Sequence, residues 1–409
     1  MRKPYMRIPY TDVLAAPTII PGSATTLSGA LAALQAFLLA PSASSLSSSS
    51  SSSGTSPSTA VLTGAGISVA SGLADYRGTN GTYRVNKTYQ PIYYSEFLRN
   101  HEARKRYWAR SFLGWTTLHK ARPNASHFAI KHLNDLGLVR SVITQNVDSF
   151  HSQAHPDLPT VELHGYLRSC VCTTCHEELP RDDFQNELAR LNPAWAAFLR
   201  EILASGALDT ENPDERRARG MKTNPDGDVD LPGAPYTTFR YPPCPRCLTN
   251  PPSTENGMPA TVEVDSDGAW ASASTAGILK PAVVMFGESI PHSVKAAAEN
   301  MINNADRLLV LGTSLATYSA WRLAKQAKDQ KKPVAIVNLG GVRGEDAFFV
   351  DLDPDQQGAQ GARVEMSTDE LLPTLVDKFR RSARVETASE TTDNIAEAHR
   401  ASVFKDMLS

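Results

Sequence analysis

A short β-rich run that ends directly on glycines constrains the fold of this chain more than any other feature of its sequence. Residues 59–63 read Thr-Ala-Val-Leu-Thr, and Gly64-Ala65-Gly66 follow at once, with Gly72 a little further on. A strand that breaks on glycines before a helix is typical of dinucleotide-binding folds, because glycines let backbone N–H groups approach a pyrophosphate. The third glycine is misplaced for the G-x-G-x-x-G pattern of dehydrogenases, and an ordinary tight turn remains an alternative.

Three further apolar runs are each followed by small polar residues. They lie at residues 141–144, 307–311 and 333–337 and read as buried strands. Open α/β sheets bind their ligands at the carboxyl ends of strands. The pattern therefore predicts an α/β fold with a Rossmann-like, doubly wound parallel sheet. The residues that follow the three runs are Gln145, Asn146 and Asp148, then Gly312, Thr313 and Ser314, and finally Asn338 and Gly340. Asn146 and Asp148 could instead serve as helix caps.

Two pairs of cysteines share the spacing of a zinc knuckle. Cys172 and Cys175 form the first C-x2-C pair, and Cys244 and Cys247 form the second. Four thiolates suit tetrahedral Zn²⁺ and leave no open position for a catalytic water. A compact zinc ribbon has about 15–20 residues between its pairs, so the longer separation here predicts a structural zinc that ties together the ends of an insert. Cys170 could replace Cys172 as a ligand, but the matching spacing favours Cys172.

Composition excludes several classes of protein. With 409 residues the chain is long enough for two domains, or for one large domain with an insert. Its 41 Lys and Arg against 43 Asp and Glu give a formal net charge of −2, which argues against a protein that mainly holds nucleic-acid backbone. No apolar run approaches the roughly 18 residues that a membrane span needs. Five cysteines, an odd number, argue against a disulfide framework.

Three motifs, in order, carry a family resemblance. GAGISVASGLADYRG begins at Gly64, TQNVD begins at Thr144 and LHG begins at Leu163. Together they resemble the sirtuin (Sir2-like) family of NAD-dependent protein deacylases, and the similarity runs from about residue 26 to about residue 379. Residues 106–115 and 191–195 resemble the class II, mitochondrial sirtuin-four-like branch of that family.

The resemblance implies a deacylase that acts on acyl-lysine proteins or peptides, transfers the acyl group from lysine to ADP-ribose and releases nicotinamide. His164 would be the general base, Asn146 would hold the nicotinamide ribose and Asp148 the nicotinamide carboxamide. Residues 279–288 would pair with the acyl-lysine peptide as an added strand, and the zinc would be structural. The implied contacts with NAD are Gly64, Ala65, Gly66, Ser68, Asp75, Tyr76, Arg77, Gln145, Asn146, Asp148, Gly312, Thr313, Ser314, Asn338 and Gly340.

The chain divides into five parts on this interpretation. They are an N-terminal segment that resembles a transit peptide (1–25), the first part of the Rossmann-like NAD-binding domain (26–164) with a Ser-rich loop (41–58), a smaller inserted zinc-binding domain with long loops (165–277), the second part of the Rossmann-like domain (278–380) and a polar tail (381–409). Residues 26–40 are expected to form a helix of the core, with a targeting helix as the alternative. The start of the chain favours the mitochondrial matrix, with the nucleus or cytoplasm as alternatives.

Some functional questions stay open from sequence alone. A protein ADP-ribosyltransferase would activate NAD in the same way, and a non-enzymatic zinc-ribbon interaction module would leave His164 unexplained. No direct nucleic-acid or membrane partner is indicated, and the oligomeric state is not indicated either. The region 88–94 lacks the Tyr–Arg pair with which some class II sirtuins select acidic acyl groups. Arg106 and Arg110 are other cations, but both are expected on a solvated helix face, so longer or branched apolar acyl groups are favoured.

Overall fold

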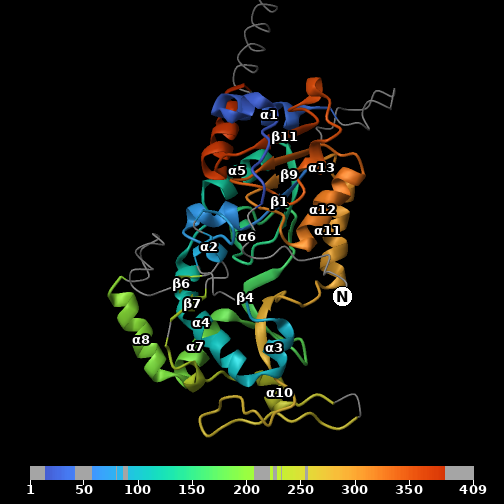
Figure 1. Ribbon diagram of the computed structural model, residues 1–409. Helices are drawn as coiled ribbons and strands as arrows, with labels where there is room; N and C mark the ends of the chain where they lie inside the picture. Colours follow the sequence, from blue (N-terminus) through green and yellow to red (C-terminus); the bar gives the residue numbers. More distant parts are fainter. Residues whose placement is uncertain are drawn as a thin grey trace, which may run out of the picture.

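The computed structural model describes residues 14–41, 58–79, 81–85, 91–206, 222–223, 228–231, 233–253 and 257–382. A larger α/β part occupies the upper half of Figure 1, and a smaller part with the paired cysteines lies below it. Most of the predicted Ser-rich loop, the first 13 residues and nearly all of the polar tail fall outside the described residues.

A six-stranded parallel sheet forms the centre of the larger part. Its strand order is β3-β2-β1-β9-β10-β11. This is the doubly wound order, in which the chain returns to the middle of the sheet after its third strand and continues outward on the other side. The predicted Rossmann-like sheet is therefore confirmed. The strands are β1 (Thr59–Thr63), β2 (Val139–Thr144), β3 (Thr160–Glu162), β9 (Arg307–Leu311), β10 (Val334–Val337) and β11 (Gly361–Val364).

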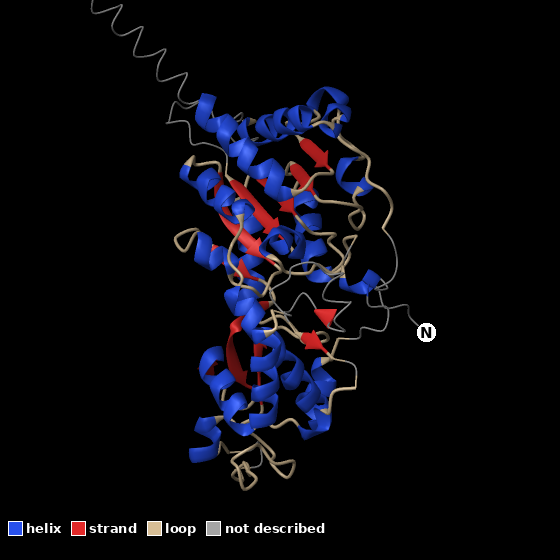
Figure 2. Cartoon of the chain, turned by 90° about the vertical axis from the view of Figure 1, so that its left-hand side faces the viewer, coloured by secondary structure: helices blue, strands red, loops and turns tan. Residues whose placement is uncertain are grey.

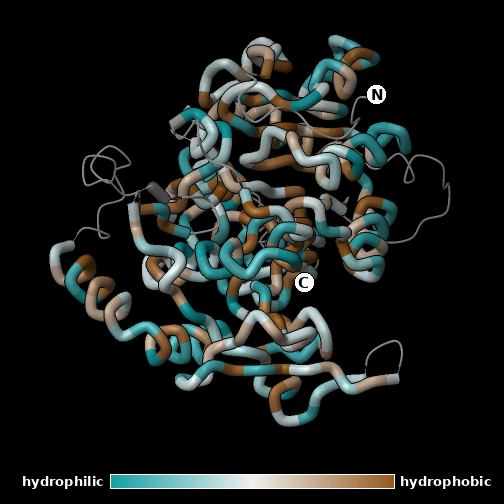
Figure 3. The backbone as a smooth tube through the Cα atoms, turned by 60° about the horizontal axis from the view of Figure 1, so that its bottom comes forward, coloured by the Kyte–Doolittle hydropathy of each residue, from teal (hydrophilic) through white to brown (hydrophobic). Residues whose placement is uncertain are grey.

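Helices cover both faces of this sheet, which explains why its central strands are apolar along their whole length. Every residue of β1, β9 and β10 is buried. One face packs against α1 (Leu27–Leu39), α5 (Ala125–Asp135) and the helical residues 368–382, and the other packs against α11 (His292–Asn304) and α12 (Tyr318–Asp329). Figure 2 shows the strands as a layer between helices, and Figure 3 shows hydrophobic segments running through the middle of this part.

The register of the sheet aligns the carboxyl ends of four strands. Thr63 pairs with Thr144 on one side and with Leu311 on the other, and Leu311 also pairs with Val337. The next residue of each chain segment therefore lies in one row at the same edge. These residues are Gly64, Gln145, Gly312 and Asn338.

Helix α1 is the helix predicted at residues 26–40, and it belongs to the core. Six of its residues are buried against the sheet. The side chain of Thr26 accepts a backbone hydrogen bond in the first turn. At the other end, the guanidinium of Arg307 donates to the carbonyl oxygens of Phe37 and Ala40, which satisfies carbonyls that the helix itself cannot.

A second sheet organises the smaller part. It is antiparallel, with the order β5-β4-β8, and consists of β4 (Gly165–Cys172), β5 (Glu178–Pro180) and β8 (Leu279–Val283). The sequence places residues from 278 onward with the Rossmann-like domain, whereas β8 pairs with β4. An apolar strand pattern does not state which sheet the strand joins, so this placement needed the structure. The surrounding helices are α3 (Tyr94–Arg99), α4 (His101–Lys120), α7 (Arg181–Leu191), α8 (Pro193–Ala204) and α10 (Pro245–Thr249).

Two features organise the insert. Helices α7 and α8 are separate, because Pro193 cannot continue a helix and instead begins the next one. The long segment after α10 is anchored by Trp270, which is buried and whose ring stacks on Tyr241 at a centroid distance of 5.8 Å.

The remaining elements are short. They are η1 (Gly22–Thr25), η2 (Ala65–Ser71), α2 (Thr82–Val85), α6 (Phe150–Ala154), β6 (Lys222–Thr223), β7 (Val229–Asp230), η3 (Tyr236–Thr238), α13 (Asp346–Phe349) and η4 (Pro354–Gln356). Among the helices of the described residues, none has the length and apolar content that crossing a membrane requires.

Candidate active site and metal centre

The loops after β1 and β9 touch each other through their backbones. The N–H of Gly66 donates to the carbonyl oxygen of Gly312, with an N···O distance of 2.8 Å. A Cβ on Gly66 would lie 2.8 Å from that oxygen, and a Cβ on Gly312, whose φ is +57°, would lie 2.5 Å from the amide nitrogen of Ile67. Contact between the two loops therefore requires both glycines. It occurs between the two strands where the sheet order changes direction, which is where α/β sheets bind dinucleotides.

The segment after Gly64 is a 3-10 helix, η2, rather than the α-helix of a dehydrogenase motif. Ala65 is its first residue, and Ser68 is buried within it. The segment ends at Gly72, whose φ of +84° is the left-handed conformation that glycine adopts most readily. The third glycine of the motif therefore ends a helix and lies away from the contact between the two loops.

Polar side chains from η2 and from the end of β2 form one network. The amide nitrogen of Asn146 donates to the hydroxyl of Ser68 and to the carbonyl oxygen of Gly64, both at 3.1 Å. Ser68 in turn donates to Asp148 at 2.7 Å. Asp148 also accepts the N–H of Phe150, the first residue of α6, but the N-cap residue of that helix is Ser149, so the helix-cap alternative does not describe Asn146 or Asp148. Burial raises the pKa of Asp148.

His164 lies beside this network, in the two-residue connection between β3 and β4. Its Nδ1 is 3.1 Å from the carbonyl oxygen of Gln145, and its Nε2 is 2.8 Å from the hydroxyl of Ser319. Burial lowers the pKa of His164 to about 4, although the hydrogen bond to Gln145 acts in the opposite direction. The imidazole is therefore neutral at physiological pH, which is the form that accepts a proton.

The loop that carries Asp75, Tyr76 and Arg77 is folded tightly on itself. Asp75 accepts the N–H of Gly78 at 3.0 Å, and burial raises the pKa of its carboxyl group. The ring of Tyr76 is 5.4 Å from that of Tyr83, and the guanidinium of Arg77 is 5.7 Å from the same ring. In this structure Asp75 stabilises the turn of the loop.

The residues after β9 and β10 line the other half of the same edge. Thr313 accepts a hydrogen bond from the side chain of Gln145 at 2.9 Å, which joins the β2 and β9 loops. The carbonyl of Ser314 accepts the N–H of Arg343 at 2.8 Å. Asn338 turns its amide nitrogen onto the carbonyl oxygen of Gly340, 3.2 Å away, and so shapes its own loop.

Arg363, a residue of β11, holds the loop after β10 by hydrogen bonds to its backbone. This residue was not identified from the sequence. Its side chain has no exposed surface, donates to the carbonyl oxygen of Asn338 at 3.0 Å and pairs with Glu345 at 2.6 Å. A charged residue inside an apolar strand was the available signal, since buried charges are almost always paired. The sequence does not identify the partner.

Three buried histidines lie behind the carboxyl end of β1, and they too were missed. His151 accepts or donates hydrogen bonds at 2.9 Å to both Thr63 and His155. The ring of His127 is 4.9 Å from that of His151, and Asn124 links this group to η2 by donating to the carbonyl oxygen of Ile67 at 2.7 Å. Burial lowers the pKa of His127 to about 3 and lowers that of His151 well below its usual value.

Acid should therefore destabilise this protein through His127 and His151. Both stay neutral when folded and become protonated near pH 6.5 when unfolded, so their stabilising contribution is present above pH 6.5 and is lost as the pH falls below it. Going from pH 7.5 to 5.5 should lower the free energy of unfolding by about 3 kcal/mol through the two residues together. Urea unfolding at both pH values measures this. His151→Asn, which does not titrate, should reduce the difference by about 1.4 kcal/mol, the contribution of one such histidine, and an unchanged difference would contradict the assignment.

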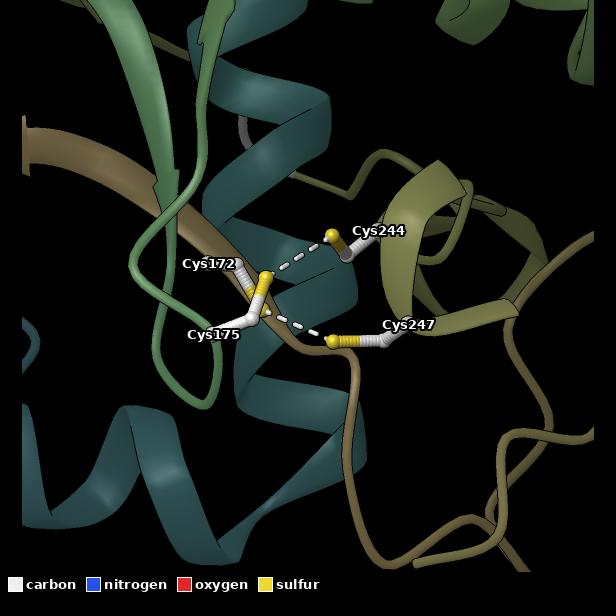
Figure 4. A group of neighbouring side chains, drawn as sticks. All are labelled: Cys172, Cys175, Cys244 and Cys247. Atoms are coloured by element: carbon white, nitrogen blue, oxygen red, sulfur yellow. Dashed lines mark hydrogen bonds between the residues drawn. The ribbon is translucent and has the colours of Figure 1, made fainter. Parts of the chain in front are cut away.

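The four paired cysteines converge on one point, as Figure 4 shows. Cys172 and Cys175 come from the end of β4 and the turn after it, and Cys244 and Cys247 come from the start of α10. Their four sulfur atoms all lie within 4.8 Å of one another, with two pairs at 3.6 Å. Cys170 is buried elsewhere on β4 and does not belong to the group, whereas Cys172 does.

This donor set fits zinc. Tetrahedral Zn–S bonds of about 2.3 Å place sulfur atoms roughly 3.8 Å apart, close to the separations found here. Four thiol groups gathered this closely have only one another as polar partners within the group, which is a poor environment for neutral or charged sulfur. A divalent cation improves this environment by stabilising every thiolate.

The carboxyl edge of the large sheet fits a dinucleotide. Backbone loops meet at the change of strand direction, and hydroxyl, amide and carboxyl groups from Ser68, Asn146 and Asp148 lie next to them. Thr313 and Asn338 extend the same edge toward β10.

Comparison with known proteins agrees with this geometry. The sequence model of the Sir2 family matches residues 64–319 of this chain. NAD-dependent protein deacylase SIR4 of Batrachochytrium dendrobatidis is 40% identical over 70% of this chain and 83% of its own length. NAD-dependent protein deacylase Sirt4 of Drosophila melanogaster is 35% identical over 80% of this chain and 85% of its own. Bovine NAD-dependent protein lipoamidase sirtuin-4, mitochondrial, is 33% identical over 72% and 77%.

The doubly wound sheet, the polar network at its carboxyl edge and the four-cysteine centre agree with these matches. The family match covers well over half of the chain, and it includes His164 and all four cysteines. NAD and zinc are the cofactors that this family and this geometry support. The chain belongs to the Sir2 family, the sirtuins.

Proposed function

We propose that this chain, a NAD-dependent protein deacylase of the Sir2 family, removes acyl groups from lysine with His164 as its general base. One observation carries the assignment of the base. The Nδ1 of His164 is bonded to the carbonyl of Gln145, the first residue after β2, so the ring stands at the carboxyl edge next to Asn146. The ring is neutral and its other nitrogen is available for proton transfer once its contact with Ser319 is exchanged.

The polar network next to His164 gives each neighbouring residue a role. When bound, NAD supplies an activated ribose carbon that releases nicotinamide and takes up the acyl oxygen. Asn146 and Ser68 would hold the ribose, Asp148 would grip the carboxamide, and His164 would take a proton from a ribose hydroxyl. The pyrophosphate would lie along residues 64–66, with Arg77 ordering the loop above it. The adenosine half would contact residues 312–314, Asn338 and Gly340.

The acylated peptide would lie beside the segment that follows β8. The N–H of Val284 donates to the carbonyl oxygen of His164 at 2.8 Å, and the carbonyl of Phe286 accepts the N–H of Tyr94 at 2.9 Å. These bonds fix the segment between the base and α3. Extended backbone fixed next to the base supports peptide binding as an added strand.

Two positively charged candidates for binding an acidic acyl group are already paired. Arg106 is partly exposed and pairs with Glu96 at 3.0 Å. Arg110 pairs with Asp228 at 2.9 Å, and both are buried, so the expectation of a solvated helix face is wrong for Arg110. A carboxylate on the acyl chain would have to compete with these protein carboxylates.

Apolar residues lie where the two parts of the molecule meet. We call them the interdomain apolar cluster; it consists of Leu73, Trp115, Leu118, Ala121, Val147, Phe150, Leu167 and Val283. Val147 stands between Asn146 and Asp148, and Val283 ends β8 just before the peptide segment. We propose that this cluster receives a long or branched apolar acyl chain. The bovine relative's name, a lipoamidase, supports the same size class.

The rate of deacylation should rise with acyl length. Each buried methylene is worth about 0.8 kcal/mol, so octanoyl-lysine should exceed acetyl-lysine in kcat/KM by at least about tenfold, with succinyl-lysine below both. A peptide series scored by mass spectrometry measures this. Val283→Thr should reduce the advantage of octanoyl, whereas Val264→Thr, at an exposed position far along the insert, should not. A maximum at acetyl would contradict the apolar pocket.

The overall function has a direct test. The purified chain should release nicotinamide from NAD only when an acylated peptide is present, and the peptide should lose its acyl group in equal amount. Transfer of labelled ADP-ribose to protein without loss of an acyl group would instead show an ADP-ribosyltransferase.

We also propose a mitochondrial location, supported by the bovine relative's name and the basic start of the chain, which cell fractionation can test.

A further inference from the structure

The first turn of α12 reaches the base from a distant part of the chain. Ser319 is the second residue of this helix, and its hydroxyl lies 2.8 Å from Nε2 of His164, 155 residues away in sequence. The hydroxyl does not cap the helix, because the N-cap residue is Thr317 and it makes no side-chain cap bond. The contact with His164 is therefore the interaction that explains a serine at this position.

The direction of both hydrogen bonds to the ring follows from their partners. The carbonyl of Gln145 can only accept, so Nδ1 of His164 carries the proton. In the neutral ring Nε2 is then an acceptor, and the hydroxyl of Ser319 must donate to it. The two contacts fix the tautomer and the orientation of the imidazole, and they direct the basic nitrogen toward α12.

The same turn also holds Gln145, the other partner of the ring. The hydroxyl of Thr317 donates to the side-chain oxygen of Gln145 at 2.9 Å, and the side-chain nitrogen of Gln145 donates to Thr313 at 2.9 Å. Residues 313–319 thus run from the loop after β9 to the base. The orientation of His164 is connected to that loop on both sides of the ring. Ser319 contacts Nε2 with its hydroxyl, and Gln145 contacts Nδ1 with its backbone carbonyl while its side chain is held by the loop.

We propose that Ser319 is a positioning residue for His164, which holds the basic nitrogen in place until a ribose hydroxyl replaces the serine hydroxyl. The proposal rests on the function proposed above for His164. Ser319 acts only through the ring. The serine hydroxyl donates to the neutral imidazole, the form of the ring that accepts a proton, and its removal should leave Nε2 without a donor.

Nearby charged side chains have little effect on the protonation of His164. Burial and the Gln145 carbonyl govern the pKa of His164, and no charged neighbour contributes a comparable effect. The charged side chains on the segments around the ring are Asp148, Glu162, Arg168, Lys280, Glu288 and Arg322.

The test compares Ser319→Ala, Ser319→Thr and Ser293→Ala in the full chain. Ser293 is the second residue of α11 and is exposed, so it controls for the loss of a serine in a helix's first turn. Nitrogen-15 NMR of the histidine side chains follows the tautomer and the titration of His164, identified by its absence in His164→Ala. This measurement does not depend on any enzyme activity.

Ser319→Ala should leave Nε2 of the neutral ring without a hydrogen-bond donor, which changes the nitrogen-15 shift of Nε2, reduce kcat about five- to tenfold at pH 7 and leave the Kd for NAD within about twofold. Ser319→Thr, which keeps the hydroxyl, should restore the wild-type shift, and Ser293→Ala should match the wild type. An unchanged Nε2 shift in Ser319→Ala would overturn the proposal. If the shift changes but the wild type does not deacylate, the positioning role stands and the function proposed for His164 fails.

Discussion

His164→Ala should lose deacylation by about 10²–10⁴-fold while still binding NAD. The proposed base is removed, but the loops that would hold the pyrophosphate and the adenosine half are not changed. Those loops are fixed by contacts that do not involve His164, such as the Gly66–Gly312 hydrogen bond and the Arg363–Glu345 pair. The substitution should therefore appear in kcat and leave the affinity for NAD nearly unchanged. Steady-state kinetics with an acyl peptide and calorimetric titration with NAD measure the two effects separately.

The matched control is His292→Ala, an exposed histidine at the start of α11. It should keep wild-type kcat and wild-type NAD affinity. Wild-type turnover in His164→Ala would remove this residue from the chemistry. A loss of NAD affinity as large as the loss of kcat would instead make His164 part of the cofactor site and leave the base unidentified.

Sequence predicts best the central strands of the large sheet, because a strand that is covered on both faces is apolar along its whole length. Residues 59–63 and 307–311 are the bounds of β1 and β9, because a strand covered on both faces is a continuous apolar run and its end is marked by glycine. Once these strands are parallel neighbours, the residues after them must meet. The row of candidate residues at the carboxyl edge follows from that alignment. The roles assigned to these residues remain predictions that the proposed variants test.

The features that sequence did not predict are contacts between distant segments. The histidine group links Thr63 to His151, and the positioning contact links His164 to Ser319. Neither contact has a local pattern, because its two residues lie on elements far apart in the sequence: Thr63 ends β1 and His151 lies in α6, whereas His164 lies between β3 and β4 and Ser319 lies in α12. The same is true of β8: its apolar residues predict a strand, but only the pairing with β4 shows which sheet it completes.

Removing one cysteine of the metal centre should have the largest effect on stability. Cys244→Ala should reduce zinc from about one atom per chain to nearly none, because three thiolates cannot close a tetrahedral structural site. Structural zinc contributes on the order of 10 kcal/mol to the folding of small zinc domains, so the smaller part should lose its fixed structure. Elemental analysis and thermal unfolding measure both results. Cys170→Ala is the matched control. Cys170 is buried on β4, the strand that also carries Cys172, but it lies outside the four-sulfur group, so this variant should keep its zinc.

Loss of zinc should also abolish deacylation, although no metal ligand lies near the base. His164 directly precedes β4 and Cys172 is its last residue, so the strand's eight residues separate the base from the metal by roughly 25 Å. The metal fixes the far end of β4, and β4 pairs with β8, which leads into the segment bonded to the carbonyl of His164. Without zinc, β8 and the peptide segment should lose their place beside the base, while the NAD loops on the large sheet keep theirs. Cys244→Ala should therefore bind NAD but not acyl peptide. Full zinc occupancy in this variant would point to a different ligand set, and wild-type peptide affinity in the zinc-free protein would show that the metal does not support the substrate side of the site.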